Sequence, residues 1–184
     1  MSAHERLVAA LRGHALVIGE VTLTSGAKAQ YLIDARRAIL RPEGFTALSE
    51  LVADRARALG ATAVGGLTMG ADPIACAALA GGADVKAFFV RKEAKEHGLA
   101  RRIEGPLLEP GDRCLVVEDV VTTGGSTIKA IDAVREAGHE VCGVVAILDR
   151  LAGGSDSIRA AIDGAPYEAL TTIDDVYPER TDGA

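Results

Sequence analysis

Short runs of consecutive apolar residues alternate with amphipathic stretches along most of the chain. In each amphipathic stretch the apolar side chains recur at helical spacing, as they do after Pro42, where Gly60 suits the C′ position. Strands that are apolar throughout are typical of a parallel sheet with helices on both faces. The pattern therefore predicts an α/β fold with a parallel central sheet flanked by helices. The expected strands are the runs 61–68, 85–90, 114–119 and 140–150.

A different pattern marks the N-terminal region. Val21 and Leu23 alternate with polar neighbours, and Tyr31 and Ile33 do so again after the Ser-Gly pair at 25–26. Alternation on both sides of a turn predicts a β-hairpin. The chain is expected to form one domain over 1–184, with a hairpin element over 1–40, a core over 41–175 and a tail over 176–184.

The sequence also predicts where two of the helices begin. Asp72 and Pro73 are predicted as the N-cap and the first helical residue of one helix. A second helix is expected to begin near Ser126, after a glycine-rich turn, with Ile128 and Ile131 on one side. Both starts follow predicted strands, so both loops lie at the carboxyl ends of strands.

Composition and charge narrow the class of protein. The chain has 184 residues, of which 48% are hydrophobic and 25% charged, as expected for an ordinary globular domain. A net charge of −6 argues against a nucleic-acid partner, whose binding face is basic. No apolar stretch reaches the length of about 18 residues that a membrane helix needs. Three cysteines without C-x-x-C spacing indicate reduced thiols and a cytoplasmic location.

The turn after the 114–119 strand combines charge, hydroxyl groups and backbone freedom. Glu118 and Asp119 end the strand, and the sequence Thr-Thr-Gly-Gly-Ser follows at 122–126. Backbone N–H groups ahead of a helix start attract an anion such as a phosphate. Carboxylates beside a phosphate make sense if they accept hydrogen bonds from sugar hydroxyls. A ribose 5-phosphate has both groups, whereas the alternative is a glycine-rich turn with solvated acids.

The segment VVEDVVTTGGST resembles the 5-phosphoribosyl 1-diphosphate (PRPP) motif of the type I phosphoribosyltransferases. The resemblance implies that family's fold, with the acids on the ribose hydroxyls and the loop on the 5-phosphate. The usual first acid of the motif is Asp, and Glu118 departs from it. The residues implied to bind PRPP here are Glu118, Asp119, Val120, Val121, Thr122, Thr123, Gly124, Gly125 and Ser126.

A charged stretch at 91–105 interrupts the alternation of apolar runs and amphipathic stretches. It holds five basic residues against three acids, a local charge of +2, so the remaining residues carry −8. Concentrated positive charge on an acidic protein indicates a nearby anion, and long polar loops often act as lids. A solvated surface loop explains the charge equally well.

Within that stretch, RKEAKEHG is similar to the catalytic loop of orotate phosphoribosyltransferases. The resemblance implies that Arg91, Lys92, Lys95 and His97 bind the diphosphate, and that Lys95, His97 and Asp119 are catalytic. It also implies a homodimer in which the 91–105 loop is shared between subunits. Mg²⁺ is expected as a cofactor carried mainly by PRPP, with no metal-binding residues in the protein.

The base-binding residues are less clear from the sequence. Arg150 ends the 140–150 strand, where its guanidinium could bind a carboxylate or form a salt bridge with Asp149. The family resemblance implies that Arg150 and Thr122 contact orotate, and that the N-terminal hairpin forms a hood over it. The chain departs from the family pattern at Thr24, Lys28, Leu32 and Ile33, and at Thr68 and Met69.

Together with these features, the family resemblance implies an enzyme that transfers the 5-phosphoribosyl group of PRPP to orotate. The products would be orotidine 5′-monophosphate and diphosphate, in pyrimidine (UMP) biosynthesis. One alternative is a phosphoribosyltransferase for a purine-type base, which would lack the RKxxKxHG signature. Another is a non-catalytic regulator that senses PRPP, which would need a broad basic surface and no Lys95.

Overall fold

A central sheet of six strands forms the middle of the protein. The computed structural model describes residues 1–22, 28–93 and 102–180. The strand order is β5-β4-β3-β6-β7-β8, and all neighbours pair in parallel except β4 and β5. The predicted α/β fold is confirmed, while the antiparallel edge strand β5 was not expected. The strands are β3 (Ala63–Leu67), β4 (Lys86–Val90), β5 (Ile103–Glu104), β6 (Arg113–Val121), β7 (Glu140–Asp149) and β8 (Tyr167–Thr172).

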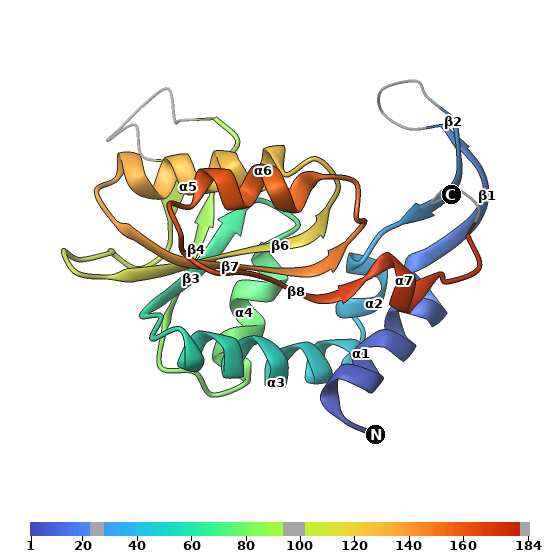
Figure 1. Ribbon diagram of the computed structural model, residues 1–184. Helices are drawn as coiled ribbons and strands as arrows, with labels where there is room; N and C mark the ends of the chain where they lie inside the picture. The colour runs from blue at the N-terminus through green and yellow to red at the C-terminus, as the bar shows by residue number, and fades with distance from the viewer. Residues whose placement is uncertain (23–27, 94–101, 181–184) are drawn as a thin grey trace.

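Helices cover both faces of this sheet (Figure 1). Helices α5 (Gly125–Glu136) and α6 (Gly154–Ala161) lie on one face, and α3 (Pro42–Ala58) and α4 (Asp72–Ala80) lie on the other. Each face has its own cluster of buried apolar side chains, which explains why the strands are apolar on both sides. The helix predicted after Pro42 is confirmed, and Gly60 takes the left-handed conformation (φ +60°) expected at C′.

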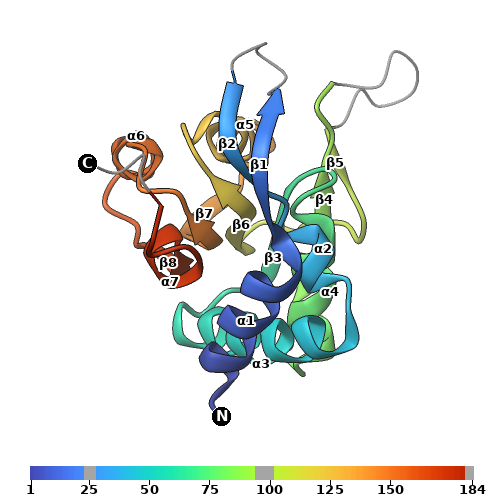
Figure 2. The same cartoon turned by 90° about the vertical axis from the view of Figure 1, so that its right-hand side faces the viewer.

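The predicted hairpin is present as a separate two-stranded sheet. Strands β1 (Leu16–Thr22) and β2 (Lys28–Ile33) pair in antiparallel fashion and project from the core (Figure 2). Tyr31 and Ile33 are buried and Leu32 between them is less so, as the alternation predicted. The expected turn at 25–26 lies outside the described residues.

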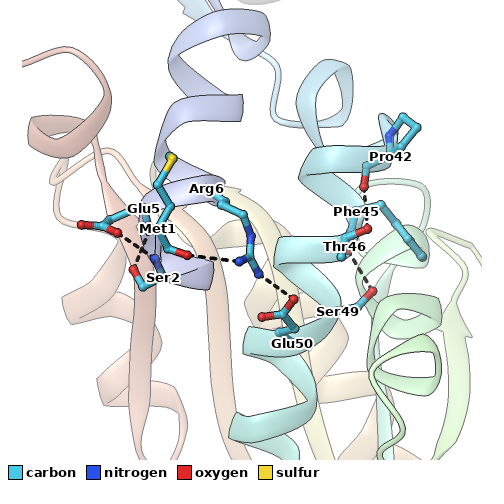
Figure 3. Close-up of polar contacts among 9 residues, drawn as sticks. All are labelled: Met1, Ser2, Glu5, Arg6, Pro42, Phe45, Thr46, Ser49 and Glu50. Atoms are coloured by element: carbon cyan, nitrogen blue, oxygen red, sulfur yellow. Dashed lines mark hydrogen bonds and ion pairs between the residues drawn. The ribbon is translucent and has the colours of Figure 1, made fainter.

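The N-terminal helix α1 (Ala3–Ala10) connects this hairpin to the core. Ser2 and Glu5 form a capping box at its start, and Arg6 forms a 2.6 Å ion pair with Glu50 of α3 (Figure 3). The π-helical turn η1 (Leu11–Ala15) and the short helix α2 (Arg36–Ile39) flank the hairpin strands. Since Leu7 and Leu11 are fully buried, packing rather than the exposed ion pair fixes this end of the chain.

Two details differ from the sequence prediction. Ala71, not Asp72, is the N-cap of α4, because both carboxylate oxygens of Asp72 accept the Thr68 hydroxyl, at 2.9 and 2.8 Å. Cys114 and Cys142 are buried as expected of core residues, but Cys76 is exposed. The chain ends beyond α7 (Ile173–Val176), and none of the described helices has the length and apolar character to cross a membrane.

Gly65 in the central strand β3 tests how tightly the sheet and its neighbours pack. A methyl group at this position would lie 2.6 Å from Cγ of the fully buried Phe88. Gly65→Ala should therefore lower the free energy of unfolding by about 1–3 kcal/mol through overpacking. Gly13→Ala is the matched control, since nothing lies within 4 Å of a methyl group there. Its effect should stay within about 1 kcal/mol in urea unfolding, and equal stability of both variants would contradict the packing described.

Candidate active site

The loop between β6 and α5 surrounds a hollow with a volume of about 130 Å³. Gly124 precedes α5 as its N-cap in the left-handed conformation (φ +82°), which favours glycine. The first N–H groups of α5 have no partner within the helix and face the region ahead of it. The hollow is lined by Glu118, Val120, Val121, Thr122, Thr123, Gly124, Gly125, Ser126 and Thr127. We call residues 120–127 the cradle.

The start of α6 packs against the backbone of the cradle. A methyl group on Gly154 would lie 2.6 Å from the carbonyl oxygen of Thr122 and 2.9 Å from the amide nitrogen of Gly124. A methyl group on Gly124 would in turn meet the carbonyl oxygen of Gly154 at 2.8 Å. The two glycines therefore allow the backbones of two loops to touch, and this contact fixes the shape of the cradle.

The two acids that end β6 have different surroundings. Glu118 is buried, and its carboxylate accepts the hydroxyl of Thr127 at 3.1 Å. Burial, and next the charge of Asp119, raise the pKa of Glu118 to about 8. Asp119 is only half-buried, and its Oδ1 accepts the backbone N–H of Val120 at 2.8 Å. Near neutral pH the raised pKa of Glu118 thus favours its protonated form.

A residue of the β3–α4 loop packs against Asp119, and a residue of α2 interacts with its charge. A methyl group on Gly70, in the β3–α4 loop, would lie 2.6 Å from Asp119 Oδ1, so this loop packs directly against the carboxylate. Arg36 of α2 forms a 2.9 Å ion pair with Asp34, and that pairing chiefly raises the pKa of Arg36. The charge of Asp119 adds a smaller contribution to the same shift. Arg36 is therefore near enough to Asp119 for their opposite charges to attract.

Arg150 lies at the same edge of the sheet as the cradle. Val121 and Asp149 are partners in the β6–β7 register, and the N–H of Arg150 donates to the carbonyl oxygen of Val121 at 2.9 Å. Its guanidinium donates to the hydroxyl of Tyr31 at 3.0 Å. The alternative salt bridge with Asp149 is not formed, because Asp149 accepts Tyr167 Oη and the N–H of Leu151, both at 2.8 Å.

The charged stretch is described only in part. Arg91 is exposed and forms a 3.6 Å ion pair with Glu104, and Lys92 is exposed beside it. Lys95 and His97 lie outside the described residues. Arg91 and Lys92 follow β4, so they leave the sheet at the edge to which the cradle also belongs.

Comparison with known proteins identifies the family. A model of the phosphoribosyl transferase domain matches residues 39–167. Over 177 residues the chain is 48% identical to an orotate phosphoribosyltransferase of Corynebacterium glutamicum (strain R). The aligned region covers 96% of this chain and 95% of that protein. The chain belongs to the orotate phosphoribosyltransferase family.

Solved structures of family members have the same fold. The Mycobacterium tuberculosis H37Rv orotate phosphoribosyltransferase in complex with Fe(III) dicitrate matches with a TM-score of 0.85 and 39% identity, over 95% of this chain and 99% of that one. A structure of the same enzyme in complex with PRPP matches with a TM-score of 0.81 and 35% identity, over 95% and 98%. The type I phosphoribosyltransferase fold expected from the sequence is confirmed.

Sequence analysis missed three residues of this site. Thr127 was not among the residues expected to bind PRPP, but it is buried and donates its hydroxyl to Glu118. Tyr31 was interpreted only as an alternating strand residue, although it contacts Arg150. Arg36 was not considered at all. These contacts join segments up to 119 residues apart, and no local pattern in a single sequence predicts such pairs.

Glu118→Gln tests the protonation of the buried acid. The folded pKa of about 8 exceeds the ordinary value of 4.5, so between these values the folded protein holds a proton that the unfolded chain has released. Wild-type stability should therefore fall as the pH rises through this window, by on the order of 5 kcal/mol, while the variant shows no such decline. Urea unfolding across a pH series measures the difference.

The exposed Glu136 provides the control for this experiment. Glu136→Gln should follow the wild-type curve at every pH, because its carboxylate stays solvated in both states. Parallel curves for wild type and Glu118→Gln would show that Glu118 is ionised in the folded protein, contrary to its burial.

Proposed function

We propose that the protein catalyses transfer of the 5-phosphoribosyl group from PRPP to orotate, as a Mg²⁺-dependent homodimer in the cytoplasm. The observation that carries the proposal is the cradle, which presents backbone N–H groups and hydroxyls beside two acids at a strand end. This arrangement matches a ligand with a phosphate at one end and a diol at the other. Family membership supports orotate as the base.

The cradle would bind the 5-phosphate of PRPP. The N–H groups at the start of α5 and the hydroxyls of Thr122, Thr123 and Ser126 supply neutral donors for its oxygens. A phosphate held by neutral donors keeps its charge, so the helix dipole contributes to binding. Asp119, and Glu118 behind it, would accept the ribose hydroxyls and fix the sugar ring.

The reaction breaks the bond between the anomeric carbon and the diphosphate, and a ring nitrogen of orotate forms the new bond. Positive charge develops on the ribose and negative charge on the leaving group. Asp119, close to the sugar, would stabilise the first, and Arg91, Lys92, Lys95 and His97 would stabilise the second. The loop at 91–105 would reach the site of the neighbouring subunit, as in the family.

Magnesium would enter this site as a partner of PRPP. Among the described residues, no group of three or more His, Cys, Asp or Glu side chains could hold a metal ion. Glu118 and Asp119 are adjacent acids, so a bound Mg²⁺ would take most of its oxygen ligands from PRPP and water. When bound, it would neutralise part of the diphosphate charge.

Orotate would bind between Thr122 and Arg150, which directly follow the adjacent strands β6 and β7. Its carboxylate is a planar anion that a guanidinium can bind in bidentate fashion. A purine base has no such group, so Arg150 would have no anionic partner with that substrate. A PRPP-sensing regulator would need a basic surface, whereas this chain has a pI of about 5.2.

Turnover tests the proposed function directly. Purified protein mixed with PRPP, Mg²⁺ and orotate should deplete the ultraviolet absorbance of orotate and release diphosphate. Chelation of Mg²⁺ should stop the reaction, and adenine or guanine in place of orotate should give none. Turnover with a purine alone would identify the purine enzyme, and PRPP binding without turnover of any base would identify the regulator.

Lys95→Ala tests the catalytic assignment in the charged loop. The variant should lose turnover by at least about a hundredfold while PRPP binding remains measurable, because Lys95 is assigned to the leaving group in the transition state. Lys129→Ala, at an exposed position on α5, is the control and should retain wild-type kcat. Full activity of Lys95→Ala would remove that residue from the mechanism.

A further inference from the structure

The backbone of Arg150 is held in place without help from its own side chain. Its N–H donates to Val121, and the preceding Asp149 accepts both Tyr167 Oη and the N–H of Leu151. These bonds fix the end of β7 next to the cradle. They leave the direction of the long, flexible arginine side chain to be set by other contacts.

Tyr31 supplies those contacts. Arg150 Nη2 donates to the Tyr31 hydroxyl at 3.0 Å, and the guanidinium carbon lies 5.0 Å from the centre of the Tyr31 ring. The Nε of Arg150 is buried and has no hydrogen-bond partner within residues 1–22, 28–93 and 102–180. A charged donor that is buried without an acceptor is unfavourable, and a bound anion would relieve it.

The chemistry of the Tyr31 hydroxyl affects Arg150 as much as its position does. A phenol oxygen accepts a hydrogen bond but carries no charge at neutral pH, so the guanidinium keeps its full positive charge. A carboxylate in the same place would neutralise Arg150 and compete with an anionic ligand. Tyr31 can therefore orient the guanidinium and still leave it available for a carboxylate.

Tyr31 is itself rigidly placed, although it comes from the hairpin. Its backbone pairs with Ile18 in the last regular position before an irregularity between Ile18 and Val21. The side chain is only 4% exposed, and the ring of Tyr177 packs against it edge-on at 5.4 Å. A side chain fixed on both sides loses little further entropy when it holds another residue in place.

We propose that Tyr31 is a positioning residue that orients Arg150 for the carboxylate of the base, so that the hairpin takes part in selecting a carboxylated pyrimidine. The inference rests on the proposed function, since it needs Arg150 to bind orotate. It adds a role for the N-terminal hairpin that does not depend on direct contact between the hairpin and the substrate.

Tyr31→Phe tests the proposal, because it removes the hydroxyl and keeps the ring. The KM for orotate should rise about tenfold, the effect of losing one hydrogen bond that orients a charged group, with kcat changed much less. The KM for PRPP should not change, and this second constant also shows that the variant is folded. Tyr31→Leu removes the ring as well and should raise the KM for orotate further.

Two comparisons separate positioning from general disturbance. Tyr177→Phe removes a hydroxyl from a neighbouring ring without removing a contact to Arg150, so its KM for orotate should match wild type. In an Arg150→Gln background, adding Tyr31→Phe should change the KM for orotate by less than about twofold, because the group that Tyr31 orients is gone.

The outcomes distinguish this inference from the proposed function. A wild-type protein that does not use orotate would overturn the proposed function itself. An active wild type with an unchanged KM for orotate in Tyr31→Phe would overturn only the positioning role. So would equal rises in the KM for orotate and PRPP, or full additivity with Arg150→Gln.

Discussion

Parallel pairing of β6 with β7 is the constraint on which the rest of the site depends. Because Val121 and Asp149 are register partners, Thr122 and Arg150 leave the sheet side by side. The loop assigned to the phosphate end of the ligand and the cation assigned to the base end therefore start from neighbouring positions. The close approach of Gly154 to Thr122 then fixes the cradle against α6. A shift in this register would separate the cradle from Arg150.

Uncharged groups surround the few charged residues of the site. The cradle supplies uncharged donors, burial keeps Glu118 protonated near neutral pH, and a phenol rather than an acid contacts Arg150. Because these neighbours are neutral, they do not cancel the charges that the proposed chemistry needs. Asp119 is the acid assigned to the ribose, and Arg150 is the cation assigned to the base. The cations assigned to the diphosphate come from the separate stretch at 91–105.

The sequence was sufficient for features that local patterns determine. Apolar runs predicted the strands, Pro42 and Gly60 marked a helix, and the order of acids, threonines and glycines after β6 located the cradle. Features that depend on long-range packing were not predictable. The contact of Tyr31 with Arg150 and the antiparallel strand β5 have no local signal. Asp72 failed as an N-cap because Thr68, four residues earlier, binds its carboxylate.

Every role proposed for the site depends on where PRPP binds, and a crystal structure of the complex with PRPP and Mg²⁺ would show this position. The 5-phosphate should lie against the N–H groups and hydroxyls of residues 122–126, with the ribose hydroxyls toward Asp119 and Glu118. A phosphate bound elsewhere, with the cradle empty, would refute the proposed site and the roles assigned to its residues.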